Sequence, residues 1–396
     1  MTNQLNQTEA YSKIDISTIL PPSTIGILGG GQLGRMMALK ARELGYRIIT
    51  LDPTEDCPCS HVADAQILAE YNDLEGAKQL AQQVDVITYE FENIGANIAA
   101  HLEAESFLPQ GYDLLYKTQN RLREKRAIEE AGGKVAPYLP ILSPDDLVQG
   151  VKQFGYPAVL KTTEGGYDGK GQLVLRQEED LKEGQALVQS GNTEWILEKW
   201  VPFAKEISVI VARNAGGEVK AFPVSENIHQ DNILHLSIVP ARIDLDVEQK
   251  ANQLAIQLAQ SFHLVGLLAI EMFLLEDGQI YVNEMAPRPH NSGHYTQQGC
   301  RTSQFEQHIR AVCNLPLGDV ELLQPTVMVN ILGQHLEPVL QQMSQLDPTC
   351  KVHLYGKKEA QKNRKMGHLN VMAESVEEAL KKIDALHIWN MEDTKS

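Results

Sequence analysis

Two glutamates in the second half of the chain, Glu271 and Glu284, have the spacing of a paired carboxylate site. The apolar runs Leu267–Leu275 and Ile280–Met285 flank Asp277-Gly278, which predicts a β-hairpin with a two-residue turn. In that register the two glutamates lie directly opposite each other, where like charges repel. A hard divalent cation between them, or a proton on one, makes the pair tolerable. Because both flanks are apolar, the sequence favours a Mg²⁺ site over an exposed pair, and Mg²⁺ commonly accompanies nucleotide phosphates.

A second segment with phosphate-binding chemistry follows Lys161, which ends an apolar run. Gly165–Gly171 contains four glycines and Lys170, which is typical of a mobile flap that closes over phosphates. It is not a P-loop, because no Ser or Thr follows Lys170. By itself the segment fits a hairpin turn with surface lysines better. If Glu271 and Glu284 form a metal site nearby, phosphate binding becomes a stronger interpretation.

Near the start, Gly29–Gly34 contains the pattern G-x-G-x-x-G between a predicted strand and a predicted helix, and Asp52 ends the next strand. This is the context of a dinucleotide fingerprint, because glycines allow close backbone approach and a helix N-terminus offers free N–H groups to a phosphate. The pattern alone leaves NAD(P), another phosphorylated ligand and a purely structural turn open.

The elements that position these residues are readable from the periodicity. Short apolar strands alternate with helices over the first hundred residues, which predicts a parallel sheet. Thr118–Ala131 is expected to be a charged helix, and beyond it short strands crowd together before a long helix at about Val247–Phe262. The expected strands are Thr24–Leu28, Arg47–Leu51, Asp85–Tyr89, Ala158–Thr162, Gln172–Leu175, Trp195–Lys199, Glu206–Ala212, Val219–Val224, Val327–Leu332, Val352–Tyr355 and Gly367–Met372.

Composition restricts the class of partner. The chain has 396 residues with 35 Lys and Arg against 52 Asp and Glu, a formal net charge of −17, which argues against nucleic acid or an anionic membrane as the main partner. No apolar run is long enough for a membrane helix, and residues 1–22 lack the pattern of a signal peptide. Five cysteines without zinc-like spacing predict a reduced, cytoplasmic protein, with a metal or redox role for Cys57 and Cys59 disfavoured.

Several motifs together resemble the ATP-grasp family. They are Lys161, the Gly-Tyr-Asp-Gly-Lys-Gly flap, Glu198-Lys199-Trp200-Val201, Glu271 with Asn283-Glu284, and the string Ala286–His294. With the glycine-rich start, they are similar to the branch of this family that carboxylates 5-aminoimidazole ribonucleotide in purine biosynthesis. The resemblance runs from about Thr24 to Met372.

The resemblance implies an α/β and α+β fold in four segments. These are a flexible extension (1–23), a Rossmann-like pre-ATP-grasp domain (24–117), an ATP-grasp domain (118–318) with a lid at about 140–202, and a small β-rich C-terminal domain (319–396). It implies an ADP-forming carbon–nitrogen ligase. ATP with Mg²⁺ would phosphorylate bicarbonate to carboxyphosphate, and the amine of 5-aminoimidazole ribonucleotide would capture the carboxyl group as 5-(carboxyamino)imidazole ribonucleotide. A homodimer is also implied.

The resemblance also assigns residues by matching position. Glu271 and Glu284 would hold Mg²⁺, and Lys161, Arg288 and His290 would serve catalysis. The glycine-rich start would face the ribonucleotide and bind no dinucleotide. The residues implied for ATP are Arg121, Lys161, Gly166, Tyr167, Asp168, Gly169, Lys170, Gly171, Gln172, Glu198, Lys199, Trp200, Val201, Glu206, His229, Asn283 and Glu284. The residues implied for the ribonucleotide are Gln32, Leu33, Tyr167, Arg288, His290, Lys357 and Arg364.

At some positions, the residue roles known from the family do not carry over directly to this sequence. Ala286 stands where many ATP-grasp enzymes have an additional Asn ligand, so the metal would depend more on phosphates and water. Arg288 and His290 could instead be structural, and His294 is as well explained by a structural role as by ligand binding. Lys358, Lys362 and Lys365 are expected on a solvated face.

Three other functions compete with this interpretation. A formate-dependent glycinamide ribonucleotide transformylase shares the start and the Arg-Pro-His segment, although Asn291–His294 favours the carboxylating enzyme. An NAD(P)-dependent oxidoreductase explains Gly29–Gly34 and Asp52 but gives the Glu271 and Glu284 pair no role. A non-catalytic nucleotide-binding regulator is disfavoured by the intact Lys161 and metal pair.

Overall fold

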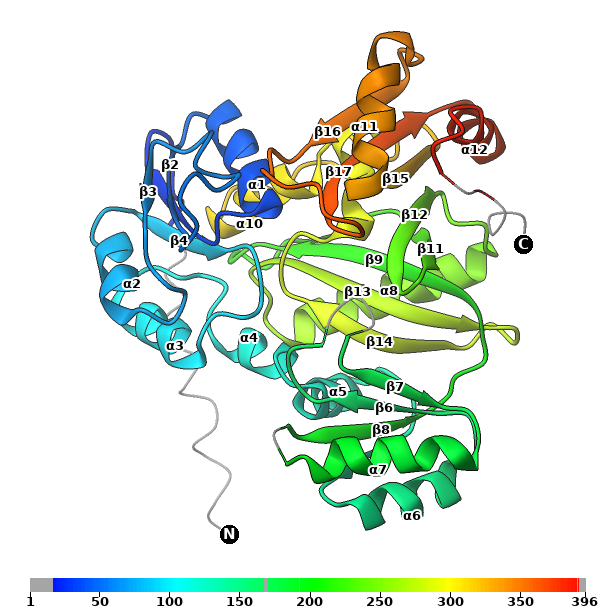
Figure 1. The fold of residues 1–396 in the computed structure, drawn as a ribbon. Coiled ribbons are helices and arrows are strands. Elements are labelled where there is room, and N and C mark those ends of the chain that lie inside the picture. Colours follow the sequence, from blue (N-terminus) through cyan, green and yellow to red (C-terminus); the bar gives the residue numbers. More distant parts are fainter. Residues whose placement is uncertain (1–16, 167–169, 192, 390, 392–396) are drawn as a thin grey trace.

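The structure is a computed structural model that describes residues 17–166, 170–191, 193–389 and 391. Figure 1 shows that the described chain folds around three β-sheets, of four, nine and four strands, with helices packed on them. The predicted fold class, a Rossmann-like start followed by an ATP-grasp module with a lid and a β-rich C-terminal part, is confirmed.

The N-terminal sheet is parallel, in the order β3-β2-β1-β4. Its strands are β1 (Thr24–Leu28), β2 (Arg47–Leu51), β3 (Ala65–Ile67) and β4 (Val86–Tyr89). β1 and β4 are almost continuous buried runs, as expected for parallel strands covered on both faces. The helices of this part are α1 (Gln32–Glu43), α2 (Leu74–Ala81), α3 (Ala96–Glu105) and α4 (Asp113–Thr118). α1 begins directly after the glycine-rich turn, which therefore lies at the carboxyl end of β1.

The lid is a separate antiparallel sheet in the order β5-β8-β6-β7. Its strands are β5 (Tyr138–Ile141), β6 (Ala158–Thr162), β7 (Gln172–Leu175) and β8 (Trp195–Lys199). The helices α6 (Pro144–Phe154) and α7 (Leu181–Gln189) cover the face that points away from the large sheet (Figure 1). The lid thus has its own small core, with Leu147, Leu160 and Leu197 among its fully buried members.

The large sheet runs in the order β14-β13-β9-β11-β12-β15-β17-β16, with β10 paired to β9. Its strands are β9 (Phe203–Arg213), β10 (Val219–Ala221), β11 (Ser225–Gln230), β12 (Ile233–Val239), β13 (Gly266–Leu275), β14 (Ile280–Ala286), β15 (Thr326–Leu332), β16 (Cys350–Leu354) and β17 (Lys365–Met372). Because β12 pairs antiparallel with β15, the C-terminal strands extend the ATP-grasp sheet rather than forming a sheet of their own. Residues of β17 therefore lie on the same platform as those of β13 and β14.

Helices stabilise this platform from several sides. α8 (Leu245–Ser261) presents Val247, Ala251, Ala255 and Leu258 at helical spacing to the core formed with β9 and β13. The other helices are α5 (Arg121–Glu130), α9 (Thr296–Gly299), α10 (Gln304–Val312), α11 (Gly333–Gln342) and α12 (Val376–Asp384). None of the helices in the described part of the chain combines the length and apolarity needed to cross a bilayer.

The predicted N-terminal extension is only partly visible, since residues 1–16 lie outside the described residues. The part that is described is held to the fold. The Ile19 amide donates to the Cys313 carbonyl at 3.0 Å, and the Tyr46 hydroxyl donates to the Ile19 carbonyl at 2.6 Å. The five cysteines are all free, including Cys57 and Cys59, which are buried.

α10 joins the N-terminal sheet to the large sheet. Its Phe305 and Ile309 are fully buried in one core with Ile25 and Met37 of the N-terminal sheet layer, while the helix also packs on β9 and β13. On the same helix, Nε2 of the buried His308 lies 2.7 Å from the Thr88 hydroxyl of β4. A single helix thus fixes the two sheets relative to each other.

We predict that Phe305→Ala lowers the free energy of unfolding by roughly 3–5 kcal/mol, because it leaves a cavity at this junction. Urea denaturation followed by circular dichroism measures the change. Leu142→Ala, at a side chain with 81% exposure, is the control and should stay within about 0.5 kcal/mol of the wild type. Equal midpoints for both variants would contradict the role given to α10.

Candidate active site

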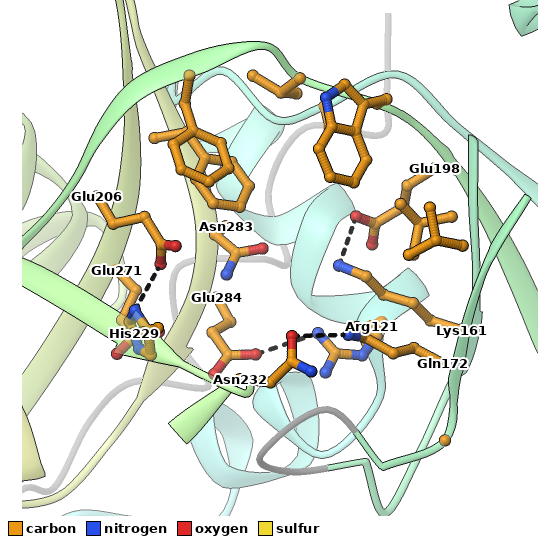
Figure 2. A pocket seen from close by; sticks show the side chains of 18 of the residues that line it. Arg121, Lys161, Gln172, Glu198, Glu206, His229, Asn232, Glu271, Asn283 and Glu284 are labelled. Atoms are coloured by element: carbon orange, nitrogen blue, oxygen red, sulfur yellow. Dashed lines mark hydrogen bonds and ion pairs between the residues drawn. The ribbon is translucent and has the colours of Figure 1, made fainter. Parts of the chain in front are cut away.

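Two cavities meet on the large sheet. The first, about 510 Å³, lies between the lid and β9, β13 and β14 (Figure 2). The second, about 400 Å³, lies between the loops of the N-terminal sheet and the segment after β14. Five residues line both cavities, and we call them the shared wall: Arg121, Glu284, His290, Asn291 and Lys365. A ligand in one cavity would therefore approach a ligand in the other at the shared wall.

A buried ion-pair cluster holds Lys161 at the lid side of the first cavity. Glu198, only 3% exposed, lies 2.9 Å from Lys161 Nζ through one oxygen and 3.1 Å from Lys125 Nζ through the other. Burial would raise the pKa of Glu198, but Lys125, Lys161 and Arg121 lower it to about 2. The carboxylate therefore stays ionised and fixes Lys161 next to the cavity (Figure 2).

Arg121 owes its position to the start of α5. The Asn120 side chain caps this helix by accepting from the amides of Leu122 and Arg123, which places Arg121 at the first helical position. From there Arg121 Nη1 reaches Glu284 Oε2 at 3.2 Å. A cation and a carboxylate from different elements are thus paired on the shared wall.

The predicted pairing of Glu271 with Glu284 across the β13–β14 hairpin is confirmed. The turn itself differs from the prediction, because the strands nearest to it are shifted by one residue and the Leu275 amide donates to the Gln279 carbonyl. A β-bulge after Glu271 absorbs the shift and leaves Asn283 as the extra residue. Asn283 and Glu284 both line the first cavity as a result (Figure 2).

The donor set at this hairpin fits a hard divalent cation. Burial and then the neighbouring Glu284 raise the pKa of Glu271 to about 7. A proton on one carboxylate, or a cation between the two, is therefore needed to offset their repulsion. Asn283 Oδ1 is buried without a hydrogen-bond partner among the described residues. Two carboxylates and a bare amide oxygen are ligands that Mg²⁺ accepts, with phosphate and water completing its shell. Within the described residues, no group of three or more His, Cys, Asp and Glu side chains forms an all-protein metal site.

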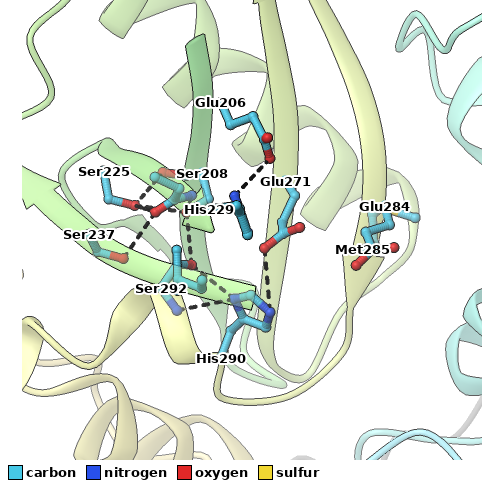
Figure 3. Close-up of polar contacts among 12 residues, drawn as sticks. Glu206, Ser208, Ser225, His229, Ser237, Glu271, Glu284, Met285, His290 and Ser292 are labelled. Carbon is cyan, nitrogen blue, oxygen red and sulfur yellow. Dashed lines mark hydrogen bonds and ion pairs between the residues drawn. The ribbon is translucent and has the colours of Figure 1, made fainter. Parts of the chain in front are cut away.

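Two histidines flank Glu271. His229 Nδ1 lies 3.1 Å from Glu206 Oε2, and His290 Nε2 lies 3.6 Å from Glu271 Oε1 (Figure 3). His290 Nδ1 accepts from the Ser292 amide at 3.3 Å and lies 2.9 Å from the Ser292 hydroxyl. Burial, together with Arg288 and Lys365, lowers the pKa of His290 well below its ordinary value. The ring is therefore neutral, with its proton on Nε2, facing Glu271.

A chain of buried hydroxyls supports this orientation from the sheet (Figure 3). Ser292 accepts from the Ser208 hydroxyl at 2.8 Å, and Ser208 accepts from Asn227 Nδ2 at 2.9 Å. Asn227 Oδ1 in turn accepts from the Ser237 hydroxyl at 3.0 Å. Because an amide nitrogen only donates, Asn227 donates to Ser208, and the chain leads through Ser292 to His290 Nδ1.

The glycine-rich turn is closed by the protein's own carboxylates. Asp52 accepts from the Gly30 amide at 2.7 Å, and buried Glu90 accepts from the amides of Gly31 and Gly34 at 2.5 Å each. A Cβ on Gly30 would lie 2.2 Å from Cys57 Sγ, so the turn needs glycine for internal packing. The dinucleotide interpretation is therefore wrong, since the amides that would hold a pyrophosphate are already occupied.

The second cavity faces this turn from the other side. Gln32 and Leu33 line it, together with Arg288, whose Nε donates to Glu92 Oε2 at 2.5 Å. Arg288 is thus tied to the loop after β4 and also faces the cavity. The cavity therefore combines groups from the N-terminal domain with groups that follow β14.

Comparisons with known proteins settle the family. A ribonucleotide synthetase preATP-grasp domain matches residues 23–114, an ATP-grasp domain 126–305, and a phosphoribosylaminoimidazole carboxylase C-terminal domain 326–382. N5-carboxyaminoimidazole ribonucleotide synthase of Bacillus subtilis is 51% identical over 365 residues, 92% of this chain and 95% of that protein. This chain belongs to the N5-carboxyaminoimidazole ribonucleotide synthase family.

Solved structures of the family agree in fold. An N5-carboxyaminoimidazole ribonucleotide synthetase in complex with ADP has a TM-score of 0.92 and 57% identity, covering 95% of this chain and 99% of its own. The Aspergillus clavatus synthase in complex with ADP and 5-aminoimidazole ribonucleotide has a TM-score of 0.84 and 31% identity, covering 92% and 97%.

Most residues that the sequence predicted for the synthase site are brought together. Around the first cavity lie Arg121, Lys161, Lys170, Gly171, Gln172, Glu198, Lys199, Trp200, Val201, Glu206, His229, Glu271, Asn283 and Glu284. Around the second lie Gln32, Leu33, Gly166, Arg288 and His290. Tyr167, Asp168 and Gly169 lie outside the described residues.

Two predicted residues line neither cavity. Lys357 Nζ donates to the Lys365 carbonyl at 2.8 Å, and burial together with Arg364 lowers the pKa of Lys357 to about 8. Arg364 Nη1 donates to the Glu359 carbonyl at 3.0 Å. Both lie next to Lys365, the residue of this basic segment that reaches the shared wall. The expectation that Lys365 belongs to a solvated face is therefore wrong.

Of the five residues of the shared wall, Lys365 and Asn291 are the two that sequence reasoning did not assign to the site. Asn291 was visible inside the string Ala286–His294, but the string does not say which of its side chains point into a cavity. Lys365 starts β17, and only the pairing of β12 with β15 brings that strand onto the ATP-grasp platform.

We predict a pH-dependent difference in stability between the wild type and Glu90→Gln. Burial raises the pKa of Glu90 to about 7, partly offset by the Gly34 and Gly31 amides, so the folded state binds this proton more tightly than the unfolded state. The wild type should therefore lose stability relative to the variant as pH rises from about 4.5 to above 7, by roughly 3 kcal/mol in total.

Urea denaturation between pH 5 and pH 8 measures the difference, and the exposed Glu70→Gln serves as the control. A wild type that gains stability relative to Glu90→Gln over this range would contradict the burial argument.

Proposed function

We propose that this chain carboxylates 5-aminoimidazole ribonucleotide with bicarbonate at the expense of ATP, with the two chemical steps at the shared wall. As a member of its family, it is an ADP-forming ATP-grasp ligase that converts 5-aminoimidazole ribonucleotide to N5-carboxyaminoimidazole ribonucleotide in purine biosynthesis. The observation that carries the proposal is that two separate cavities share Arg121, Glu284, His290, Asn291 and Lys365.

The first cavity is proposed to take ATP. Its base end would lie at Lys199-Trp200-Val201, with the backbone of Val201 offering a base-pairing edge and Glu206 accepting from the ribose. Lys161 and Arg121 would hold the phosphates, His229 would lie near the terminal ones, and the flap 166–172 would close over them. The fixed position of Lys161 on Glu198 supports this orientation, because a positioned cation costs little to organise during the reaction.

Mg²⁺ is proposed at Glu271 and Glu284, with Asn283 beside them. When bound, the cation neutralises phosphate charge and so eases attack by another anion. The paired register and the unpartnered Asn283 oxygen support the assignment. Arg121, now paired with Glu284, would turn to the phosphates when the carboxylate takes the cation.

The second cavity is proposed to take the ribonucleotide. Gln32 and Leu33 would contact it from the N-terminal domain, and Tyr167 would stack on the imidazole. Arg288 and His290 would hold its reacting end together with bicarbonate, and Lys357 and Arg364 would grip the 5′-phosphate. The closed glycine turn supports the assignment, because it presents side chains rather than free amides to the cavity.

The proposed chemistry has two balanced steps. An oxygen of bicarbonate attacks the γ-phosphorus of ATP, the bond to the β-phosphate oxygen breaks, and ADP leaves with carboxyphosphate formed. The amine of the ribonucleotide then attacks the carboxyl carbon, phosphate leaves, and the nitrogen loses a proton. Carboxyphosphate hydrolyses readily, so a lid that excludes water over the shared wall has a clear purpose.

A cytoplasmic homodimer is also proposed. The absence of disulfides among the five cysteines supports a reducing compartment. Exposed Leu340 on α11 and Met343 directly after this helix provide apolar surface for a second copy. Sedimentation equilibrium at micromolar concentration tests the dimer.

The decisive experiment measures ADP release with ATP, Mg²⁺ and bicarbonate, with and without 5-aminoimidazole ribonucleotide. We expect strong stimulation by the ribonucleotide, with one phosphate formed for each product. Turnover with glycinamide ribonucleotide and formate instead would move the chain to the transformylase. Absence of turnover with both acceptors would reject the assigned acceptor site.

We predict that Glu284→Gln lowers ADP release by more than roughly 100-fold, because it removes a direct ligand of the proposed Mg²⁺. Loss of a group that only hydrogen-bonds a metal ligand already costs about 10- to 100-fold. The substitution is nearly isosteric, so the melting temperature should stay close to that of the wild type. Glu276→Gln, at the exposed turn of the same hairpin, is the matched control. Full activity of Glu284→Gln would reject the carboxylate-pair assignment.

A further inference from the structure

Asn291 stands out on the shared wall because its side chain has no partner. Both Nδ2 and Oδ1 are buried, and neither forms a hydrogen bond with any of the described residues. The residue lines both cavities, so this unpartnered amide belongs to a residue at the wall where the two cavities meet. A buried amide with all its hydrogen-bonding capacity unused is rare in proteins and points to a missing ligand.

The backbone around Asn291 is fixed on both sides. The His290 carbonyl accepts from Gln304 Nε2 at 2.7 Å and from the Gly293 amide at 3.0 Å, and the Asn291 carbonyl accepts from the His294 amide at 3.1 Å. Ser292 is held by the Ser208 hydroxyl. The side chain is therefore presented from a rigid segment, and its position does not depend on the lid.

We propose that Asn291 is a specificity-determining residue that binds bicarbonate as a planar pair. Nδ2 donates to one oxygen of bicarbonate, and Oδ1 accepts from the bicarbonate hydroxyl. The third oxygen stays free to attack the γ-phosphate. The inference rests on the proposed function and adds to it the group that recognises the one-carbon substrate.

The other reacting groups at the shared wall, and formate, do not match this amide. Ionised phosphate oxygens only accept, which would leave Oδ1 without a donor. The amine of the ribonucleotide mainly donates, which would leave Nδ2 without an acceptor. Formate accepts through both oxygens but has no hydroxyl, so it too leaves Oδ1 unmatched. Bicarbonate alone among these offers a donor and an acceptor side by side, and Arg121 and Lys365 of the same wall supply positive charge for an anion.

The variant Asn291→Leu tests this assignment, because it keeps the size of the side chain and removes both polar groups. ADP release is measured in CO₂-free buffer at varied bicarbonate, with ATP, Mg²⁺ and the ribonucleotide saturating. We expect the KM for bicarbonate to rise about tenfold, as for loss of buried hydrogen bonds, while the KM values for ATP and for the ribonucleotide change by less than about twofold. Asn291→Asp should raise the bicarbonate KM further, because its charge repels the anion.

Formate provides a second measurement. As a competitive inhibitor against bicarbonate, it gives a ratio of formate Ki to bicarbonate KM, and this ratio should fall about tenfold in Asn291→Leu. Asn252→Leu is the matched control. Asn252 lies on α8 with a buried Oδ1 that also has no partner among the described residues, but it lines neither cavity, so this variant should keep the bicarbonate KM.

The outcomes separate the two proposals. An unchanged bicarbonate KM in Asn291→Leu, or equal rises in the KM values of all three substrates, would overturn the role given to Asn291. A wild type without ADP release that depends on both bicarbonate and the ribonucleotide would overturn the proposed function itself, whatever the variants do.

Discussion

The close pairing of Glu271 and Glu284 is the constraint around which the site is built. Two carboxylates on neighbouring strands repel, and burial makes the charge of Glu271 more costly. Arg121 pairs with Glu284, and His229 and His290 lie beside Glu271. Among the described residues, the Asn283 amide oxygen next to them has no hydrogen-bond partner. These groups balance only part of the charge, which is why the pair suits the proposed Mg²⁺ site.

In the glycine-rich turn, by contrast, the polar groups are satisfied within the chain. Its amides form the anion site that a Rossmann-type turn always offers, but Asp52 and Glu90 of the same chain occupy it. An internal carboxylate in place of a bound phosphate turns a ligand site into a structural joint between β1, β2 and β4. The second cavity then uses the outer side of this joint, through Gln32 and Leu33. The same motif thus serves packing within the domain and lines a cavity outside it.

Much of the fold was predictable because its signals are local. Thr24–Leu28, Arg47–Leu51 and Ala158–Thr162 were predicted to the residue, since each is a short apolar run between turns. β11 and β12 were missed because polar residues such as Asn227 and Ser237 are buried within them as a hydrogen-bonded network, which no periodicity reveals. The Glu271–Glu284 pair was found although the turn was placed one residue away, because the bulge at Asn283 restored the register. Lys365 and Asn291 depend on pairing between distant strands and on side-chain direction, which the sequence does not encode locally.

The buried ion pairs explain how the lid sheet holds Lys161 in a fixed position at the first cavity. Lys161 and Glu198 both belong to the lid sheet, whereas Lys125 belongs to α5, which packs on β14. Glu198 binds both lysines, so one carboxylate connects the lid to the body of the site. Because this contact is buried, salt screens it little, and separating Glu198 from Lys125 would leave a buried charge unpaired. Glu198 is therefore the point at which a buried ion pair holds the lid sheet to α5.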